Sequence, residues 1–174
     1  PKDSTGRTPL HSASLSGHLQ IIEHLLQHIE GDINPSDSIG RTALHYAAQG
    51  GHLNVVSYYT NILTNPNPGC LTNDQFRGRT PLHQAAQWGH LPVVQHICNL
   101  LEDKNPKDAN DYTPLHLAAL QGHLDVVKFL VQHVKDKHPK DGVYWGQKTP
   151  LDYAKEKGHS KIVKFLISEG NSKS

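Results

Sequence analysis

Small and apolar residues recur along the chain in five pairs of short segments with helical spacing. In the third pair, Leu82 and Ala85–Ala86 fall on one face of the first segment. Val93 and Ile97 fall on one face of the second. Residues three or four apart share a helix face, so each segment predicts a short amphipathic helix. The pattern therefore predicts five helix–turn–helix units.

Polar and conformationally special residues mark the ends of these segments. In the first unit, Thr8 is a candidate N-cap, and Pro9 suits the first helical position, where a missing N–H costs nothing. Gly17 suits the C-terminal cap of the same helix. We therefore expect the first helix to begin after Thr8 and to end at Gly17.

The same markers return at a fixed inner distance. Five Thr-x-Leu-x runs begin at Thr8, Thr42, Thr80, Thr113 and Thr149, and each leads to a Gly-His pair that starts nine residues later. The Thr residues follow one another by 34, 38, 33 and 36 positions. A constant inner spacing with a variable outer spacing indicates structural repeats joined by loops that tolerate insertions.

The run Thr-Pro-Leu-His-x-Ala-Ala-x-x-Gly-His resembles the ankyrin repeat. The resemblance covers nearly the whole chain. It implies an all-α solenoid of five helix–turn–helix repeats, with a β-turn finger between neighbours. We expect one array over residues 1–174, with repeats at about 3–36, 37–72, 75–107, 108–140 and 141–174.

The resemblance also implies a protein–protein interaction module, a scaffold or adaptor whose fingers and first helices form a concave binding surface. Read onto this sequence, the exposed positions richest in aromatic residues and arginine predict a binding site for a protein or peptide. The predicted site residues are Ile39, Arg41, Phe76, Arg77, Arg79, Trp88, Tyr112, Leu120 and Trp145. The structural alternative is that Trp88 and Tyr112 stack on neighbouring fingers, with Arg79 beside them. The functional alternative is a targeting segment of a larger enzyme or channel.

Composition narrows the range of partners. A formal net charge of +1 argues against a general polyanion binder. Nucleic acid or anionic lipid could still be bound through arginines aligned along the fingers, namely Arg7, Arg41, Arg77 and Arg79. No apolar run approaches the ~20 residues that cross a membrane. The chain has no signal-peptide pattern, and its two cysteines form no metal or disulfide pattern, so we expect a cytoplasmic location, with the nucleus as the alternative. We also expect a monomer.

The candidate chemical groups predict structure rather than catalysis. Nine of the fourteen histidines are repeat residues, and the resemblance implies that they tie helix ends to loops. His24 and His28 share a helix face but lack the further ligands that a zinc site needs. We expect Cys98 to be a core residue and Cys70 to be exposed in a loop. No metal, cofactor or catalytic site is predicted, and the chain is not expected to be an enzyme. Asn34 resembles the asparagine that hydroxylases modify in ankyrin repeats.

Two regions depart from the repeat. Residues 64–70, with two prolines and a glycine, predict an irregular loop that accounts for the 38-residue spacing. The last repeat gains three residues within Gly142–Gly146 and has Asp152 where the others have His. Its lysines predict the polar outer face of a terminal unit. The first repeat has no such adaptation, so we expect further repeats upstream.

Overall fold

The computed structural model describes residues 2–70 and 77–171. Within these residues the protein is all-α, with ten α-helices, one short 3-10 helix and no β-strand; one isolated antiparallel bridge joins Ser36 and Thr42. The predicted all-α repeat solenoid is confirmed.

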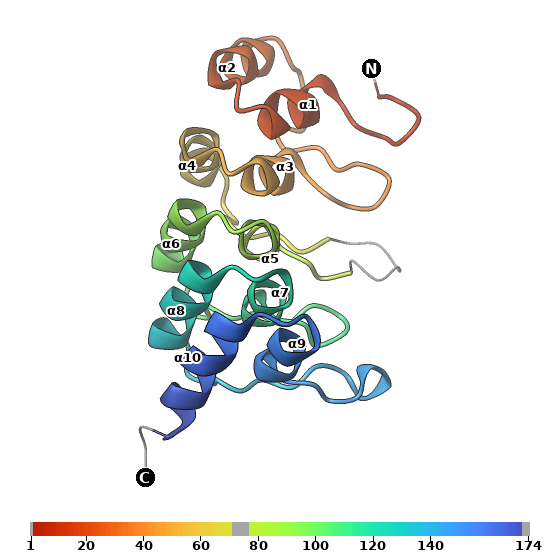
Figure 1. Cartoon of the computed structure of the whole chain (residues 1–174). Coiled ribbons are helices and arrows are strands. Elements are labelled where there is room, and N and C mark those ends of the chain that lie inside the picture. The colour runs from red at the N-terminus through yellow and green to blue at the C-terminus, as the bar shows by residue number, and fades with distance from the viewer. Residues whose placement is uncertain (1, 71–76, 172–174) are drawn as a thin grey trace.

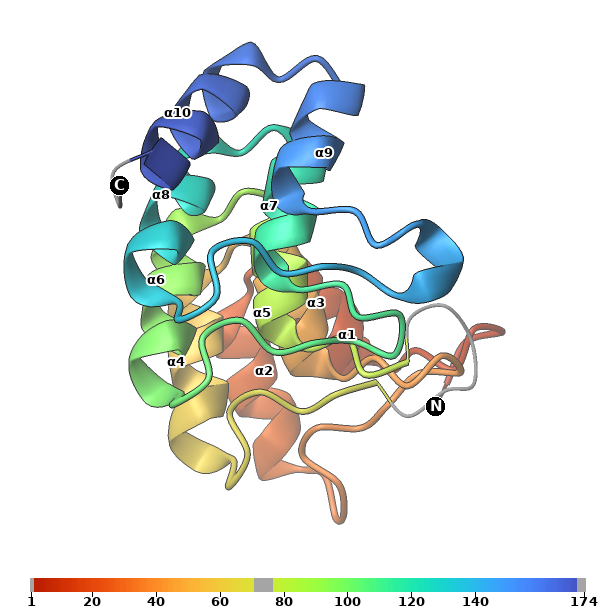
Figure 2. The ribbon, with the colours of Figure 1, turned by 90° about the horizontal axis from the view of Figure 1, so that it is seen from below.

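The helices form five pairs stacked in chain order (Figure 1). The first helices are α1 (Pro9–Leu15), α3 (Ala43–Gly50), α5 (Pro81–Gln87), α7 (Pro114–Gln121) and α9 (Pro150–Glu156). The second helices are α2 (Leu19–Gln27), α4 (Leu53–Ile62), α6 (Leu91–Leu100), α8 (Leu124–His133) and α10 (Ser160–Asn171), and the 3-10 helix η1 is Val143–Trp145. First and second helices form two rows, and the loops project beyond the row of first helices (Figures 1 and 2).

Each projecting loop is a hairpin that we call a finger, closed by a hydrogen bond from its first N–H to its last carbonyl. Fingers 1 to 5 are Asp3–Arg7, Asp37–Arg41, Cys70–Arg79, Asp108–Tyr112 and Asp141–Lys148, with closing distances of 2.8, 2.9, 2.8, 2.8 and 3.1 Å. The fingers also contact one another. The Ala109 N–H donates to the Arg77 carbonyl at 2.9 Å, and the Gly142 N–H donates to the Asn110 carbonyl at 2.8 Å.

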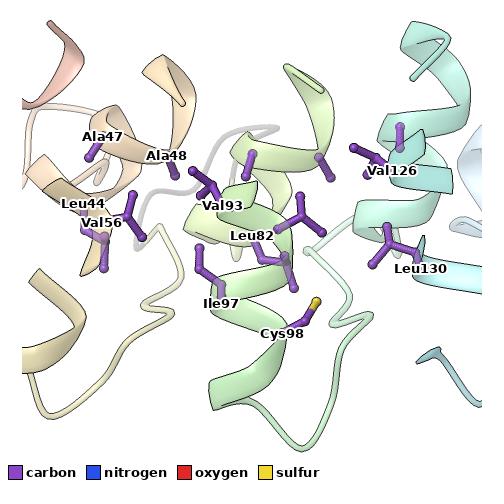
Figure 3. Close-up of a cluster of buried hydrophobic side chains, with 14 of the residues drawn as sticks. Leu44, Ala47, Ala48, Val56, Leu82, Val93, Ile97, Cys98, Val126 and Leu130 are labelled. Carbon is purple, nitrogen blue, oxygen red and sulfur yellow. The ribbon is translucent and has the colours of Figure 1, made fainter. Parts of the chain in front are cut away.

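The core lies between the two rows of helices (Figure 3). The alanine pairs of the first helices are fully buried, which lets neighbouring first helices approach closely. Leu44, Leu82 and the second-helix valines Val56 and Val93 fill the space beside them. Because every unit buries its apolar face on its neighbours, the stack shares one continuous core.

Hydrogen bonds join the loops between first and second helices of neighbouring repeats. Each bond runs from a histidine to a carbonyl of the preceding repeat. The His123 Nε2 atom donates to the Gln87 carbonyl of the preceding repeat at 2.9 Å. His52, His90 and His159 make the same bond to the carbonyls of Leu15, Gln49 and Leu120, at 2.9, 2.8 and 3.0 Å. We call these four bonds the backward ladder. It fixes the C-terminal end of each first helix against the next repeat.

Cys70 was expected in an exposed loop, and this is wrong, since its exposed fraction is 2%. Cys70 occupies the place of the aspartate that begins the other four fingers. The extra residues that lengthen the spacing to 38 therefore lie inside finger 3, and residues 64–70 contain no insertion. From Cys70 to Arg79 is nine positions, whereas Asp108 to Tyr112 is four.

The backward ladder packs a histidine ring against Gly89 but not against Gly158. Replacement by alanine should therefore destabilise the protein more at Gly89 than at Gly158. Gly89 and Gly158 both have positive φ, +78° and +72°, so a side chain strains either backbone. A Cβ on Gly89 would also lie 2.4 Å from the His123 ring, whereas a Cβ on Gly158 would meet nothing within 4 Å. We expect Gly158→Ala to cost about 1–2 kcal/mol and Gly89→Ala about 3–4 kcal/mol. Urea denaturation followed by circular dichroism measures both, and equal losses would contradict the packing role of the histidine.

Candidate functional site

The candidate site is the surface formed by the fingers and the first helices, and a second row of histidines holds it in place. In repeat three, the His83 Nδ1 atom accepts from the Thr80 N–H at 3.2 Å and lies 2.9 Å from the Thr80 hydroxyl. The same ring places Nε2 3.0 Å from the Tyr112 carbonyl, at the end of finger 4. Because a carbonyl can only accept, Nε2 carries the proton.

This arrangement occurs four times, and we call it the forward ladder. His11, His45 and His116 lie 3.2, 3.0 and 3.1 Å from the carbonyls of Arg41, Arg79 and Lys148. In the fifth repeat, Asp152 replaces the histidine and still caps α9, accepting from the Thr149 N–H at 2.9 Å. An ionised carboxylate has no proton to donate, so the forward ladder ends with His116.

Burial sets the protonation state of the forward ladder. It lowers the pKa of His45 to about 4 and that of His83 to about 3, against the opposing effect of the carbonyl that each ring contacts. Burial also lowers the pKa of His11 and His116. The four imidazoles are therefore neutral at physiological pH.

In fingers 1, 2, 4 and 5 the first residue is an aspartate whose carboxylate accepts hydrogen bonds from the backbone of the finger. The Asp108 Oδ1 atom accepts from the backbone N–H groups of Asn110 and Tyr112, at 2.9 and 3.0 Å. Asp37 does the same for Ile39 and Arg41, at 3.0 and 2.9 Å. These bonds fix the backbone of the finger before any partner arrives.

Three of the four arginines predicted on the fingers form ion pairs with these carboxylates. Arg7 and Arg41 pair with Asp3 and Asp37, each through Nε at 3.0 Å. The Arg41 guanidinium also lies 4.6 Å from the centre of the Tyr46 ring. The Arg41 ion pair is thus partly buried, whereas the Arg7 pair lies at the surface, with side-chain exposed fractions of 42% and 43%.

Among the predicted site residues, Arg79 forms an ion pair that is largely buried. Its Nε atom lies 3.1 Å from Asp108 Oδ2, with side-chain exposed fractions of 12% and 0% for the two residues. Its Nη1 atom donates to Gln87 Oε1 at 3.3 Å, so the side chain also contacts the last residue of α5. Burial raises the pKa of Asp108, against the effect of its hydrogen bonds and of Arg79. Arg79 therefore stabilises the contact between fingers 3 and 4.

Tyr112 and Trp145 belong to one aromatic cluster on fingers 4 and 5. The Tyr112 hydroxyl lies 2.6 Å from that of Tyr153 on α9, and the Tyr153 hydroxyl donates to Asp141. The Tyr112 and Trp145 rings meet edge to face, with centroids 6.2 Å apart. The Tyr112 ring therefore packs against the neighbouring finger, which is the contact that the structural alternative expects.

Trp88 is different, because its side chain is 53% exposed at the C-terminal end of α5. Arg77 is also exposed, and Ile39 and Leu120 are half-buried. Phe76 lies outside the described residues. Of the predicted site residues that the structure describes, Trp88, Arg77 and Trp145 therefore present the most accessible side chains.

Sequence reasoning missed the tyrosines that anchor the finger carboxylates. Tyr46 donates its hydroxyl proton to Asp37 at 2.8 Å, as Tyr153 does to Asp141. Both tyrosines stand four residues after the Thr of their repeat. Aligning the repeats on that Thr could have revealed the pairing of this tyrosine with the first aspartate of the finger.

The remaining chemical candidates have structural environments. Cys98 is fully buried in the core, as predicted, and burial raises the pKa of its thiol to about 12. Among residues 2–70 and 77–171, no three His, Cys, Asp or Glu side chains come together in a metal-binding arrangement. The Asn34 Oδ1 atom accepts from the Leu44 N–H at 3.2 Å, and its hydroxylation stays a prediction. In the same described ranges, no helix has the length and hydropathy to cross a membrane.

Stacked helix pairs with projecting, pre-ordered fingers define a helical-repeat protein of the kind that presents a binding surface along its length. The chain belongs to the ankyrin-repeat family. The family model for ankyrin repeats matches residues 1–61, 59–141 and 97–174. Members of this family are generally protein–protein interaction modules and are typically non-catalytic. A search of curated proteins finds no match.

The buried histidines predict a loss of stability in mild acid. In the unfolded chain a histidine titrates near pH 6.5, whereas His45 and His83 titrate near 4 and 3 in the folded protein. Below pH 6.5 the unfolded state binds protons first, so the free energy of unfolding falls as pH drops toward 4. At about pH 5.5 we expect a loss of about 1.4 kcal/mol for each of these histidines. Urea midpoints measured from pH 7.5 to 4.5 test this, and a decline that begins only below about pH 4.5 would implicate carboxylates instead.

Two arginines of finger 3 should differ sharply when replaced. Arg79→Ala leaves the Asp108 carboxylate buried without its ion pair, and we expect a loss of about 3 kcal/mol. Arg77→Ala removes an exposed side chain, so its effect should stay within about 0.5 kcal/mol. Thermal and urea denaturation of both variants provide the comparison. A fully stable Arg79→Ala protein would contradict the stabilising role of the ion pair with Asp108.

Proposed function

We propose that the array is a scaffold or adaptor module that recognises a partner protein or peptide on the surface formed by its fingers and first helices. The observation that carries the proposal is the half-exposed Trp88 at the end of α5, since an indole of this size is a frequent anchor in protein interfaces. Gln87, the residue before Trp88, is held by Arg79. A partner would therefore meet a surface that is already ordered.

The pre-ordering supports tight recognition for a physical reason. Association costs free energy whenever loops or side chains must be immobilised. Here the forward ladder fixes the end of fingers 2 to 5. The carboxylates of Asp37, Asp108 and Asp141 also bond to the backbone of fingers 2, 4 and 5. Less of the interaction free energy is then lost in ordering the array.

The test is affinity capture from cell lysate with the native array, Trp88→Ala and a matched control, Leu100→Ala. Leu100 is 49% exposed on α6, in the row of second helices. Captured proteins are identified by mass spectrometry, and their affinity is then measured with purified components. We expect Trp88→Ala to weaken binding at least about tenfold while Leu100→Ala binds normally. Equal binding by all three proteins would place recognition elsewhere. Arg79 is left intact because its replacement should disturb the fold.

A further inference from the structure

Finger 5 carries exposed aromatic side chains on an extension that the shorter fingers lack. Its extra residues form η1, where Val143, Tyr144 and Trp145 have exposed fractions of 76%, 100% and 48%. No other three consecutive large apolar side chains in the described part of the chain are exposed together. Figure 2 shows finger 5 projecting away from α9, which is the last helix in the row of first helices.

The base of this extension is held in one position. The Gly142 N–H donates to the Asn110 carbonyl of finger 4 at 2.8 Å. The Trp145 ring packs against Tyr112, which is in turn fixed by its contact with the Tyr153 hydroxyl. The folded chain therefore supports part of Trp145 and leaves Tyr144 entirely in solvent. An anchored aromatic turn of this kind is suited to receive an apolar side chain of a partner.

A lysine with no ion pair to any described residue precedes the turn, and the nearby carboxylate of Asp111 already has a cationic partner. Directly before finger 4, Lys107 pairs with Asp111 four residues later, at 3.1 Å. Lys140 has the corresponding place before finger 5, but the residue four positions later is Tyr144. Lys140 is exposed, and no ion pair joins it to any described residue.

The part of the chain that contains finger 5 carries an excess of positive charge. Residues 135–174 contain nine lysines and five acidic residues, whereas residues 1–134 contain eight basic and eleven acidic residues. All five acids are engaged within the fold. Glu156 and Glu169 pair with Lys148 and Lys137, at 2.7 and 2.8 Å. Asp136, Asp141 and Asp152 accept hydrogen bonds from His138, Tyr153 and Thr149. A positive field next to an apolar turn favours carboxylates and disfavours a basic segment.

We propose that the finger-5 surface, formed by Lys140, Val143, Tyr144 and Trp145, docks an acidic peptide segment of a partner protein. Tyr144 and Trp145 pack against a large apolar side chain of the segment, and Lys140 pairs with a flanking carboxylate. This inference rests on the proposed function, because it names one place where a partner docks and the chemistry of the segment that docks there.

The experiment selects displayed random peptides on the intact array and then measures the affinity of a fluorescent copy of the consensus peptide. We expect the consensus to combine aspartate or glutamate with a large apolar residue. Three variants test the surface: Tyr144→Ser, the pair Tyr144→Ser/Trp145→Ser, and Lys140→Glu. Each should weaken binding at least about tenfold, and added salt should weaken binding to the native array.

Matched controls lie on the second helices. Leu100→Ser removes an exposed apolar side chain from α6, and Lys128→Glu reverses an exposed charge on α8. Both should bind the peptide as the native array does. Tyr144→Ser alone keeps the test valid if the double variant folds poorly, since the Tyr144 side chain is fully exposed.

A basic or uncharged consensus, or equal affinity for the Tyr144 variants, would overturn the inference. If binding were then lost in Trp88→Ala, the proposed function would stand without the finger-5 surface. If neither peptides nor proteins bound the native array, both would fall. Binding to phosphatidylserine vesicles that depends on Tyr144, with no peptide selected, would assign the surface to a membrane and reject the peptide.

Discussion

The neutral imidazole that joins one repeat to the next is the interaction on which the rest of this structure depends. One ring performs two tasks at once: Nδ1 accepts from the N-cap residue of its own helix, and Nε2 donates to the last carbonyl of the next finger. Packing of alanine and leucine between helices is strong but has little direction. The hydrogen bond supplies the direction, because a buried carbonyl left without a donor would cost about 1–3 kcal/mol. Register between neighbouring repeats is thereby tied to the protonation state of a histidine.

The two ladders act at opposite ends of the first helices. The forward ladder joins the start of a helix to the following finger, and the backward ladder joins the end of a helix to the following repeat. Each first helix in the middle of the stack is thus fixed at both ends. Neither ladder involves a finger tip, which explains why fingers 3 and 5 can be longer without disturbing the stack. Variation can accumulate at the tips while the positions of the fingers stay constant.

The sequence predicts those features of this structure that depend on neighbouring residues, and it fails for features that depend on residues far apart along the chain. Thr80, Pro81 and Gly89 mark helix ends through local backbone chemistry, and their repetition made the fold predictable. Cys70 was misjudged because a single change from aspartate, combined with an insertion, removed the marker of a finger start. The burial of Arg79 depends on Asp108, 29 residues away, and the position of Tyr112 depends on Tyr153, 41 residues away. Partners so distant are not visible in a local pattern, so the sequence alone could not show that these side chains are partly buried and hydrogen-bonded within the chain.

This ambiguity has a physical basis that bears on the binding surface. Arginine and tyrosine suit interfaces because they combine apolar area with directional polar groups, and the same properties suit them to tie neighbouring fingers together. What separates the two roles is whether the polar group already has a partner inside the chain. Arg79 has Asp108, and Tyr112 has Tyr153, so their interactions are already used in stabilising the array. Trp88 and Tyr144 keep most of their surface in solvent, at a cost that folding does not recover. The free energy of binding is therefore best sought at such side chains, where the fold leaves apolar area exposed.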